Sequence, residues 1–118
     1  MAGLEQRVRF VVLHHTGVVP EHFDLMVQMP GEEMLRTWRI VASPSTWKAP
    51  PSNPPTAERL ADHRAAYLMY EGAVSGNRGQ VKRVAEGEAV VGEEGGWLVM
   101  VLESLSCTLH LPLAFHSK

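Results

Sequence analysis

The sequence predicts a mainly β protein, a small antiparallel β-barrel that is closed or partly open, with one short helix and a proline-rich loop. Seven or so short segments rich in Val, Leu, Ile and aromatic residues are separated by Gly and Pro turn signals. Only one segment has a composition typical of a helix, and the strand-helix-strand alternation of a parallel sheet is absent. A curled or closed antiparallel sheet also leaves few strand edges exposed.

The N-terminal part of the chain contains three of the expected strands. Residues 7–15 (RVRFVVLHH) are rich in Val and Phe and are followed by Thr16 and Gly17, which favour a turn. Residues 22–29 (HFDLMVQM) alternate in polarity and are followed by Pro30, which predicts a second strand. Because only the short loop 16–21 separates the two segments, they are expected to form a hairpin. A third strand is predicted over 34–41 (MLRTWRIV), with alternate side chains on its two faces.

The middle of the chain changes character. Residues 43–55 contain five prolines, which remove backbone donors and predict an irregular surface loop. Thr56 is a suitable N-cap for a short helix over 57–66 (AERLADHRAA), which is rich in good helix formers. Beyond the glycine-bearing stretch 72–79, turn signals separate four further predicted strands: 80–85, 88–91, 97–103 and 107–115.

Composition limits the function classes. The chain has 118 residues, fits one domain spanning 1–118, and has a net charge of -2 with a pI near 6.3. This balance argues against a general, charge-driven nucleic-acid coat protein but leaves room for a local basic cleft. A single cysteine, Cys107, excludes an internal disulfide framework and a multi-cysteine zinc site. The N-terminus lacks a secretory signal pattern and no membrane segment is expected, so the expected compartment is the cytoplasm.

One group of residues could hold a metal ion: His14, His15, His22 and Asp24. Imidazole nitrogens and carboxylates are preferred ligands of borderline divalent metals. His22 and Asp24 are two apart on a strand and share a face, whereas only one of His14 and His15 can face them. A hairpin through residues 16–21 would close a three-ligand site. Alternatively, the histidines are loop-edge residues and Asp24 pairs with a cation.

A second group lies at 62–67. His63 can donate a proton to a phosphate oxygen near neutral pH, and Tyr67 could add a hydroxyl on the same side if this segment is helical. The alternative is a solvated helix end with Tyr67 in the core. Gly76-Asn77-Arg78-Gly79 favours a tight turn, because it lacks the glycine spacing of nucleotide-binding loops.

Basic and aromatic residues offer weaker signals. Arg78, Lys82 and Arg83 could form a ridge that contacts a nucleic-acid backbone, or they are ordinary solvated charges. Among the tryptophans, Trp47 in the proline loop is the better candidate for stacking on a base. The other two, Trp38 and Trp97, lie in strand patterns that favour the core.

Two separated blocks resemble the 3′-phosphoesterase module found with bacterial DNA ligase D and its stand-alone relatives. That family has a Phe-Val-Val strand ending in His, then His-Tyr-Asp, and later Asp-His, a Tyr four residues on, and Glu-Gly. This chain has FVVLHH at 10–15, HFD at 22–24 and DHRAAYLMYEG at 62–72. The similarity touches most of residues 7–84. It implies a β-barrel phosphoesterase domain and a role in DNA end repair.

The resemblance also implies roles for individual residues. The offset from Phe10 selects His15 as the first metal ligand, joined by His22 and Asp24. His63 and Tyr67 would engage the phosphate as catalytic residues, and manganese is the expected ion, with zinc or cobalt as alternatives.

The chain departs from the family at two positions. Met26 stands where the family has an arginine, and Ala42 stands at about the position of its lysine. Replacement charge for phosphate binding is expected from Arg39, Arg59 or Arg78, of which Arg39 and Arg59 form the more attractive pair.

The leading hypothesis is therefore a metal-dependent hydrolase that removes a 3′-phosphate or 3′-ribonucleotide from DNA or RNA ends. Its partners would be primer-template or RNA-ended DNA, together with ligase and polymerase repair proteins. A non-catalytic module that binds nucleic-acid ends or a repair partner is the alternative, and loss of the family arginine at Met26 favours it. A metal-independent interaction protein is a third hypothesis.

Overall fold

The computed structural model describes residues 6–48 and 54–115, and over these ranges the protein is built from strands and short 3-10 turns. No α-helix occurs in the described residues. In chain order the elements are β1 (Gln6–Thr16), β2 (His22–Gln28), β3 (Met34–Ile40), η1 (Pro44–Thr46), β4 (Ala57–Arg64), η2 (Ala65–Leu68), β5 (Gly72–Ala73), β6 (Gln80–Glu94), β7 (Trp97–Leu102), η3 (Glu103–Leu105) and β8 (Cys107–Pro112).

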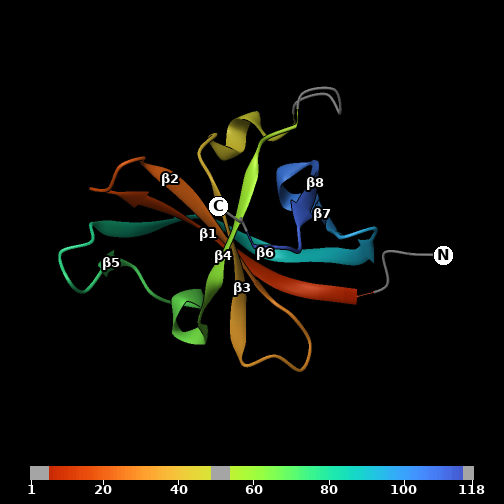
Figure 1. The fold of residues 1–118 in the computed structure, drawn as a ribbon, viewed down its shortest axis with the longest axis horizontal. Coiled ribbons are helices and arrows are strands. Elements are labelled where there is room, and N and C mark those ends of the chain that lie inside the picture. Colours follow the sequence, from red (N-terminus) through yellow and green to blue (C-terminus); the bar gives the residue numbers. More distant parts are fainter. Residues whose placement is uncertain (1–5, 49–53, 116–118) are drawn as a thin grey trace.

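The strands form one antiparallel sheet in the order β4-β3-β2-β1-β6-β7-β8, and β5 adds to β6. The sheet is strongly curled, so that β3 and β4 run steeply across β1 and β6 in Figure 1. Its two edge strands, β4 and β8, approach without pairing in the described residues. Trp38 Nε1 of the adjacent strand β3 donates to the Pro112 carbonyl of β8 at 2.7 Å. Arg59 Nη1 likewise donates to the Leu113 carbonyl at 2.9 Å. The predicted partly open antiparallel barrel is confirmed.

Side-chain alternation gives the sheet two apolar faces. Phe10 and Val12 of β1 belong to the main core inside the curl, with Trp38, Trp47 and most buried residues of β7 and β8. Val11 and Leu13 point to the other face, where a smaller cluster also contains Met26, Leu35, Val81 and Leu68. Tyr67 and Val74 pack against that smaller cluster, so the segment that follows β4 covers this face of the sheet. The candidate site lies on the same face.

The helix predicted over 57–66 is wrong. Residues 57–64 form β4, which pairs with β3 from Ala57 opposite Ile40 to Arg64 opposite Met34, and only a 3-10 turn follows. Helix propensity is worth only tenths of a kcal/mol per residue. Pairing with β3 supplies the backbone partners that β3 would otherwise lack, so the sheet overrides the local preference.

The turn expected between the predicted strands 80–85 and 88–91 is also absent. Both belong to the 15-residue strand β6. Gly87 lies opposite Phe10, and a Cβ built on Gly87 would approach the Phe10 ring to 3.5 Å. The glycine therefore marks the packing of a ring against a strand and not a chain reversal.

Two of the three tryptophans lie where the sequence did not predict. Trp47 is 1% exposed and donates Nε1 to the Ala42 carbonyl, so it is part of the core and not a free stacking platform. Trp97 is 45% exposed, because it lies on the outward-facing set of β7 while Leu98 points inward. Trp38 is fully buried, as predicted.

The described flanks of the predicted proline loop run through η1 and rejoin the sheet at β4, and residues 49–53 of that loop lie outside the described residues. No helix in the described part of the chain is long and apolar enough to cross a bilayer.

Candidate metal centre

The β1–β2 hairpin brings three of the predicted ligands together. In its register His15 lies directly opposite His22, and Leu13 lies opposite Asp24. Directly opposite residues share a face, and residues two apart on a strand share it too. His15, His22 and Asp24 therefore project from one face at the turn end of the hairpin, beside the loop 17–21.

The distances confirm that the three side chains converge. His15 Nδ1 is 3.3 Å from Asp24 Oδ2, and His22 Nε2 is 3.2 Å from Asp24 Oδ1. One donor atom from each residue lies within 4.8 Å of the others. Two ligands held at about 2.0–2.2 Å from one ion are at most about 4.4 Å apart, and that only when they lie on opposite sides of it, so the donor atoms must move together by at least a few tenths of an ångström to bind one ion. The donor set of two nitrogens and one oxygen suits a borderline divalent ion.

Burial leaves this triad in need of a positive charge. Asp24 is 3% exposed and His22 is 4% exposed. The buried Oδ1 atom of Asp24 has no hydrogen-bond partner in the described structure. Leaving a carboxylate oxygen buried and unsatisfied is costly, and a cation at the centre of the triad would remove that cost.

Backbone carbonyls determine which nitrogen of each histidine faces the centre. His15 Nε2 lies 2.7 Å from the carbonyl of Arg78, and His22 Nδ1 lies 2.8 Å from the carbonyl of Pro20. A carbonyl only accepts, so these nitrogens carry the protons. In the neutral rings the lone pairs on His15 Nδ1 and His22 Nε2 then face Asp24. Metal-binding histidines commonly have this arrangement, in which the second nitrogen donates to a carbonyl.

The same geometry affects the proton affinity of His22. The Asp24 carboxylate beside Nε2 raises the pKa of His22 above its ordinary value of 6.5, and the Pro20 carbonyl acts in the same direction. Burial and the charge of Arg39 oppose this shift. A proton or a metal ion thus satisfies the same need, positive charge between an imidazole and a carboxylate.

Two glycines let the turn at 74–79 approach β1 closely enough to supply the Arg78 carbonyl. Gly79 has φ +81°, and a Cβ there would lie 2.1 Å from the Thr16 carbonyl oxygen. Gly17 has φ +77°, and its Cβ would lie 3.0 Å from the Gly79 Cα atom. The predicted tight turn is present, closed by a 2.8 Å bond from the Val74 amide to the Gly79 carbonyl.

His14 lies outside the triad, which resolves the choice between the two adjacent histidines. Its ring stacks on Phe23 with a centroid separation of 4.4 Å, and its Nε2 lies 2.6 Å from Glu21 Oε2. Neighbouring residues on a strand point to opposite faces, so His14 and His15 cannot both face Asp24.

The predicted phosphate-engaging pair lies on the same face but further along the sheet. Asp24 is opposite Arg39 on β3, whereas His63 is opposite Leu35, four residues away. At about 3.3 Å per residue, this offset is about 13 Å along the strand. His63 and Tyr67 contact each other edge to face at 5.6 Å, and His63 Nδ1 donates to the Ala61 carbonyl.

The three predicted phosphate-binding arginines have different surroundings. Arg39 faces Asp24 across the β2–β3 ladder, and its buried Nε atom has no hydrogen-bond partner in the described structure. Its Nη1 lies 3.7 Å from Glu58 Oε1. Arg39 is therefore the arginine that the sheet places beside the triad.

The side chains of Arg59 and Arg78 do not lie beside the triad. Arg59 lies opposite Trp38, over the main core, where it stacks on that indole at 5.1 Å and donates to Asp62 and Leu113. The side chain of Arg78 folds back onto Ser75, and only its carbonyl reaches the triad. Met26 is on the triad's face, as predicted, but is buried in the smaller apolar cluster.

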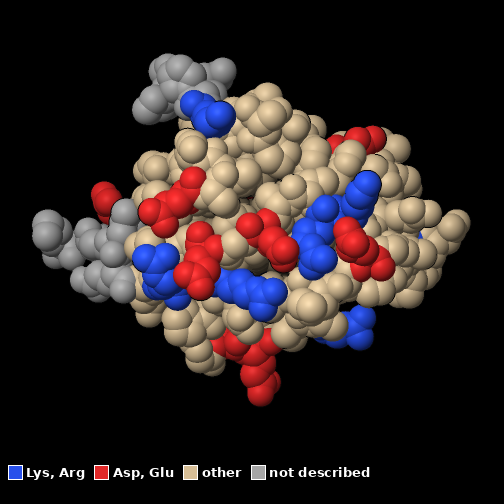
Figure 2. All heavy atoms as spheres, turned by 180° about the vertical axis from the view of Figure 1, so that it is seen from behind, with Lys and Arg blue, Asp and Glu red and all other residues tan. Residues whose placement is uncertain are grey.

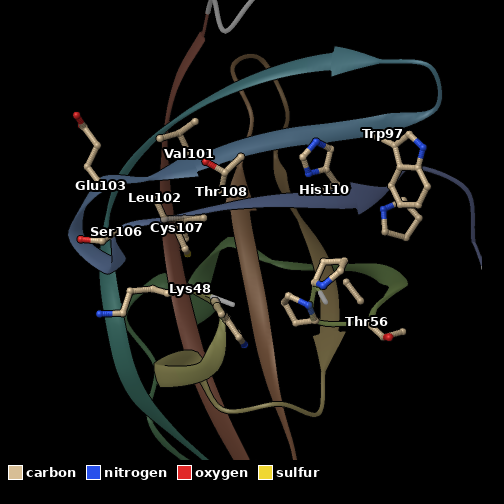
Figure 3. A pocket seen from close by; sticks show the side chains of 15 residues that line it. Lys48, Thr56, Trp97, Val101, Leu102, Glu103, Ser106, Cys107, Thr108 and His110 are labelled. Atoms are coloured by element: carbon tan, nitrogen blue, oxygen red, sulfur yellow. The ribbon is translucent and has the colours of Figure 1, made fainter. Parts of the chain in front are cut away.

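A separate cavity lies away from the triad. A cavity of about 1110 Å³ separates β7 and β8 from the segment around η1 and the start of β4. Figure 3 shows Trp97 and His110 at one end, and Lys48, Glu103 and Ser106 at the other. None of the triad residues lines it, and its floor includes the core residues Leu102 and Cys107. This cavity is thus separate from the candidate metal centre.

Charge on the surface is mixed. On the face seen in Figure 2, Lys and Arg side chains are interspersed with Asp and Glu, and they do not form a continuous basic stripe. This agrees with the net charge of -2. The view gives no support for a broad electrostatic surface for nucleic acid on that face.

Comparison with known proteins does not assign the chain to a family. No model of a known protein family matches the chain, and no curated protein is similar enough to count as a relative.

Proposed function

We propose that the protein is a metal-dependent phosphoesterase that acts on the 3′ ends of nucleic acids. One observation carries this proposal: the donor atoms of His15, His22 and Asp24 converge within 4.8 Å, and two backbone carbonyls turn both imidazole lone pairs toward them. The choice of a phosphoester as substrate rests on the resemblance of the sequence to the ligase D module. Manganese remains the proposed ion, with zinc or cobalt as alternatives.

A bound divalent ion would polarise a phosphoryl oxygen and lower the pKa of bound water. His15, His22 and Asp24 would hold that ion, and the carbonyls of Arg78 and Pro20 would keep the two rings in the binding orientation. Arg39 contributes a guanidinium whose side chain is 33% exposed, and that positive charge beside the triad fits an anionic substrate. The roles proposed for His63 and Tyr67 require the substrate to extend along the sheet toward them.

The test is release of phosphate from a 3′-phosphorylated primer strand annealed to a template, with manganese added. The wild-type protein should release phosphate, and His15→Ala should lose that activity. His14→Ala is the matched control, because it removes an imidazole one residue away on the opposite face of the hairpin. Activity that survives His15→Ala, or equal loss in both variants, would contradict the assignment.

A second candidate function is a module that binds 3′ ends without turnover. Two observations favour it. Met26 is buried where the resembling family has an arginine. His63 lies on β4 opposite Leu35, which is four residues along β3 from Arg39. Manganese-dependent binding of a primer-template end, with no release of phosphate under manganese, zinc or cobalt, would select this function. Partnership with ligase or polymerase repair proteins stays part of both proposals.

A further inference from the structure

A small pocket lies beside the turn that supports the metal centre. It has a volume of about 250 Å³ and is lined by Arg64, Ala66, Tyr67, Tyr70, Ala73, Val74 and Ser75. Drug-sized ligands occupy pockets of about 300–1,000 Å³, so this one suits a single flat ring system and not a large molecule. No carboxylate lines it. An acidic residue in the lining would oppose an approaching phosphodiester chain, and the lining contains none.

Its aromatic walls are held in place. The Tyr67 and Tyr70 rings meet edge to face, with centroids 5.6 Å apart at 81°. The Tyr70 hydroxyl donates to the carbonyl of Ala73, which also lines the pocket. Tyr70 nevertheless remains 39% exposed. A ring that is already fixed in the folded protein loses little side-chain entropy when a ligand stacks on it, so its accessible surface provides a stacking platform.

Two guanidinium groups lie at the edges of this pocket. Arg64 lines it, and within the described ranges its side chain makes no hydrogen bond or ion pair, although its backbone pairs with Met34 in the sheet. Arg78 contacts the pocket residue Ser75 through Nε and Nη2, at 2.7 and 3.2 Å from its carbonyl and hydroxyl oxygens. Arginine beside an exposed aromatic ring is the combination that single-stranded nucleic acid recognises, through its phosphates and its bases.

The pocket is also joined to the metal centre by a short piece of chain. Ser75 lines the pocket, and the carbonyl of Arg78, three residues on, accepts the hydrogen bond from His15. Three residues span at most about 10 Å even when extended, and this segment is a closed turn. Ser75, at the edge of the pocket, is therefore within about 10 Å of the residue whose carbonyl supports His15, which puts the pocket within reach of the terminal nucleotides of a strand that ends at the triad.

We propose that this pocket binds the nucleobase of the 3′-terminal nucleotide, stacked on Tyr70, while Arg64 and Arg78 contact the adjoining backbone phosphates. The inference rests on the proposed function, because it takes the triad as the place where the chain end is held. It adds a specificity site: the protein would select ends whose terminal base is unpaired, since a base in a duplex stack is not free to enter the pocket.

The test compares two short single-stranded DNAs with a 5′ fluorophore and a 3′ hydroxyl, so that no phosphate is available for release. One carries a base on its terminal nucleotide and the other is abasic there. Anisotropy with manganese present should show tighter binding of the first by about 5- to 150-fold, the range that one stacked base contributes. Tyr70→Leu should remove this preference, and Tyr70→Phe should keep it because the ring remains.

A second variant covers the case in which Tyr70→Leu does not fold. Ala73→Phe adds a large side chain at a residue that lines the pocket, keeps Tyr70 in the sequence, and should cause the same selective loss. Met69→Ala is the control, since this neighbouring side chain is exposed and does not line the pocket. Equal affinity of the wild-type protein for both DNAs, or no measurable binding of either, would overturn the proposal.

The outcome is separable from that of the proposed function. Base-dependent binding without phosphate release would keep the pocket as the base site of an end-binding module and remove the esterase. Phosphate release with no dependence on the terminal base would keep the esterase and remove the base site.

Discussion

The carbonyl of Arg78 accepts a hydrogen bond from His15 Nε2 at 2.7 Å, although the two residues are 63 positions apart. This contact makes Nδ1 the nitrogen of His15 that faces Asp24. It exists because the turn at 74–79 packs against the end of β1, where Gly79 and Gly17 meet backbone to backbone. A residue with no functional group, Gly79, therefore controls the orientation of a candidate metal ligand.

Gly79→Ala should weaken metal binding without altering any proposed ligand. Its Cβ would lie 2.1 Å from the Thr16 carbonyl oxygen, so the turn must move away and the Arg78 carbonyl must leave His15. Loss of such a supporting contact typically reduces metal affinity about 10- to 100-fold. Calorimetric titration with zinc or manganese measures the change.

Gly31→Ala is the matched control for this prediction. Gly31 has φ +80°, almost the same as Gly79, but a Cβ there meets nothing within 4 Å. Both variants thus carry the cost of about 1–2 kcal/mol for a left-handed alanine, and only one carries the clash. If the two variants bind metal with equal affinity, the proposed role of the turn is wrong.

The titration of His22 should depend on Asp24. The carboxylate raises the pKa of His22, so the folded state holds this proton more tightly than the unfolded chain. In chelator-treated protein, the resulting stability is fully present below the ordinary value of about 6.5 and is lost as pH rises through the higher folded-state pKa. NMR titration should show Asp24→Asn lowering the pKa of His22. An unchanged pKa would mean that the carboxylate does not act on this ring.

Arg39 and Arg59 should separate function from stability. Arg59→Ala should lower the free energy of unfolding by about 1.5–3 kcal/mol, because a side chain only 9% exposed loses its charged hydrogen bonds to Asp62 and Leu113. Arg39→Gln should have a smaller effect on denaturant unfolding, since Arg39 makes only a 3.7 Å ion pair with Glu58. It should instead raise the KM for a 3′-phosphorylated strand. A large loss of stability in Arg39→Gln together with a raised KM in Arg59→Ala would contradict these assignments.

The sequence was sufficient to predict the triad because strand periodicity and a hairpin are local features. The two-residue spacing of His22 and Asp24 determines their shared face, and the register of the hairpin places His15 opposite His22. Choosing His15 over His14 needed the resemblance, since alternation alone leaves either residue open.

The errors arose where long-range pairing decides the conformation. Residues 57–64 have helix-forming side chains, but β3 needs an edge partner and recruits them as β4. Arg59 then points over Trp38 and away from the triad. The supporting carbonyl of Arg78 was equally beyond prediction, because no sequence spacing indicates which distant turn a histidine will meet. Gly76 and Gly79 predicted a turn, but they did not indicate that this turn would contact the end of β1.

Asp24→Asn should test whether the triad binds a divalent ion through its charge. The substitution keeps the size of the side chain but replaces the buried, partnerless Oδ1 of a carboxylate with a neutral amide. With the charge gone, two imidazoles alone must hold the ion, so the rise in melting temperature on adding zinc or manganese should largely disappear. Glu21→Gln is the control, because Glu21 pairs with His14 on the other side of the hairpin and should leave the metal-induced rise intact. A wild-type protein that shows no rise with any of these ions, or an Asp24→Asn protein that keeps it in full, would remove the metal centre and the proposed esterase with it.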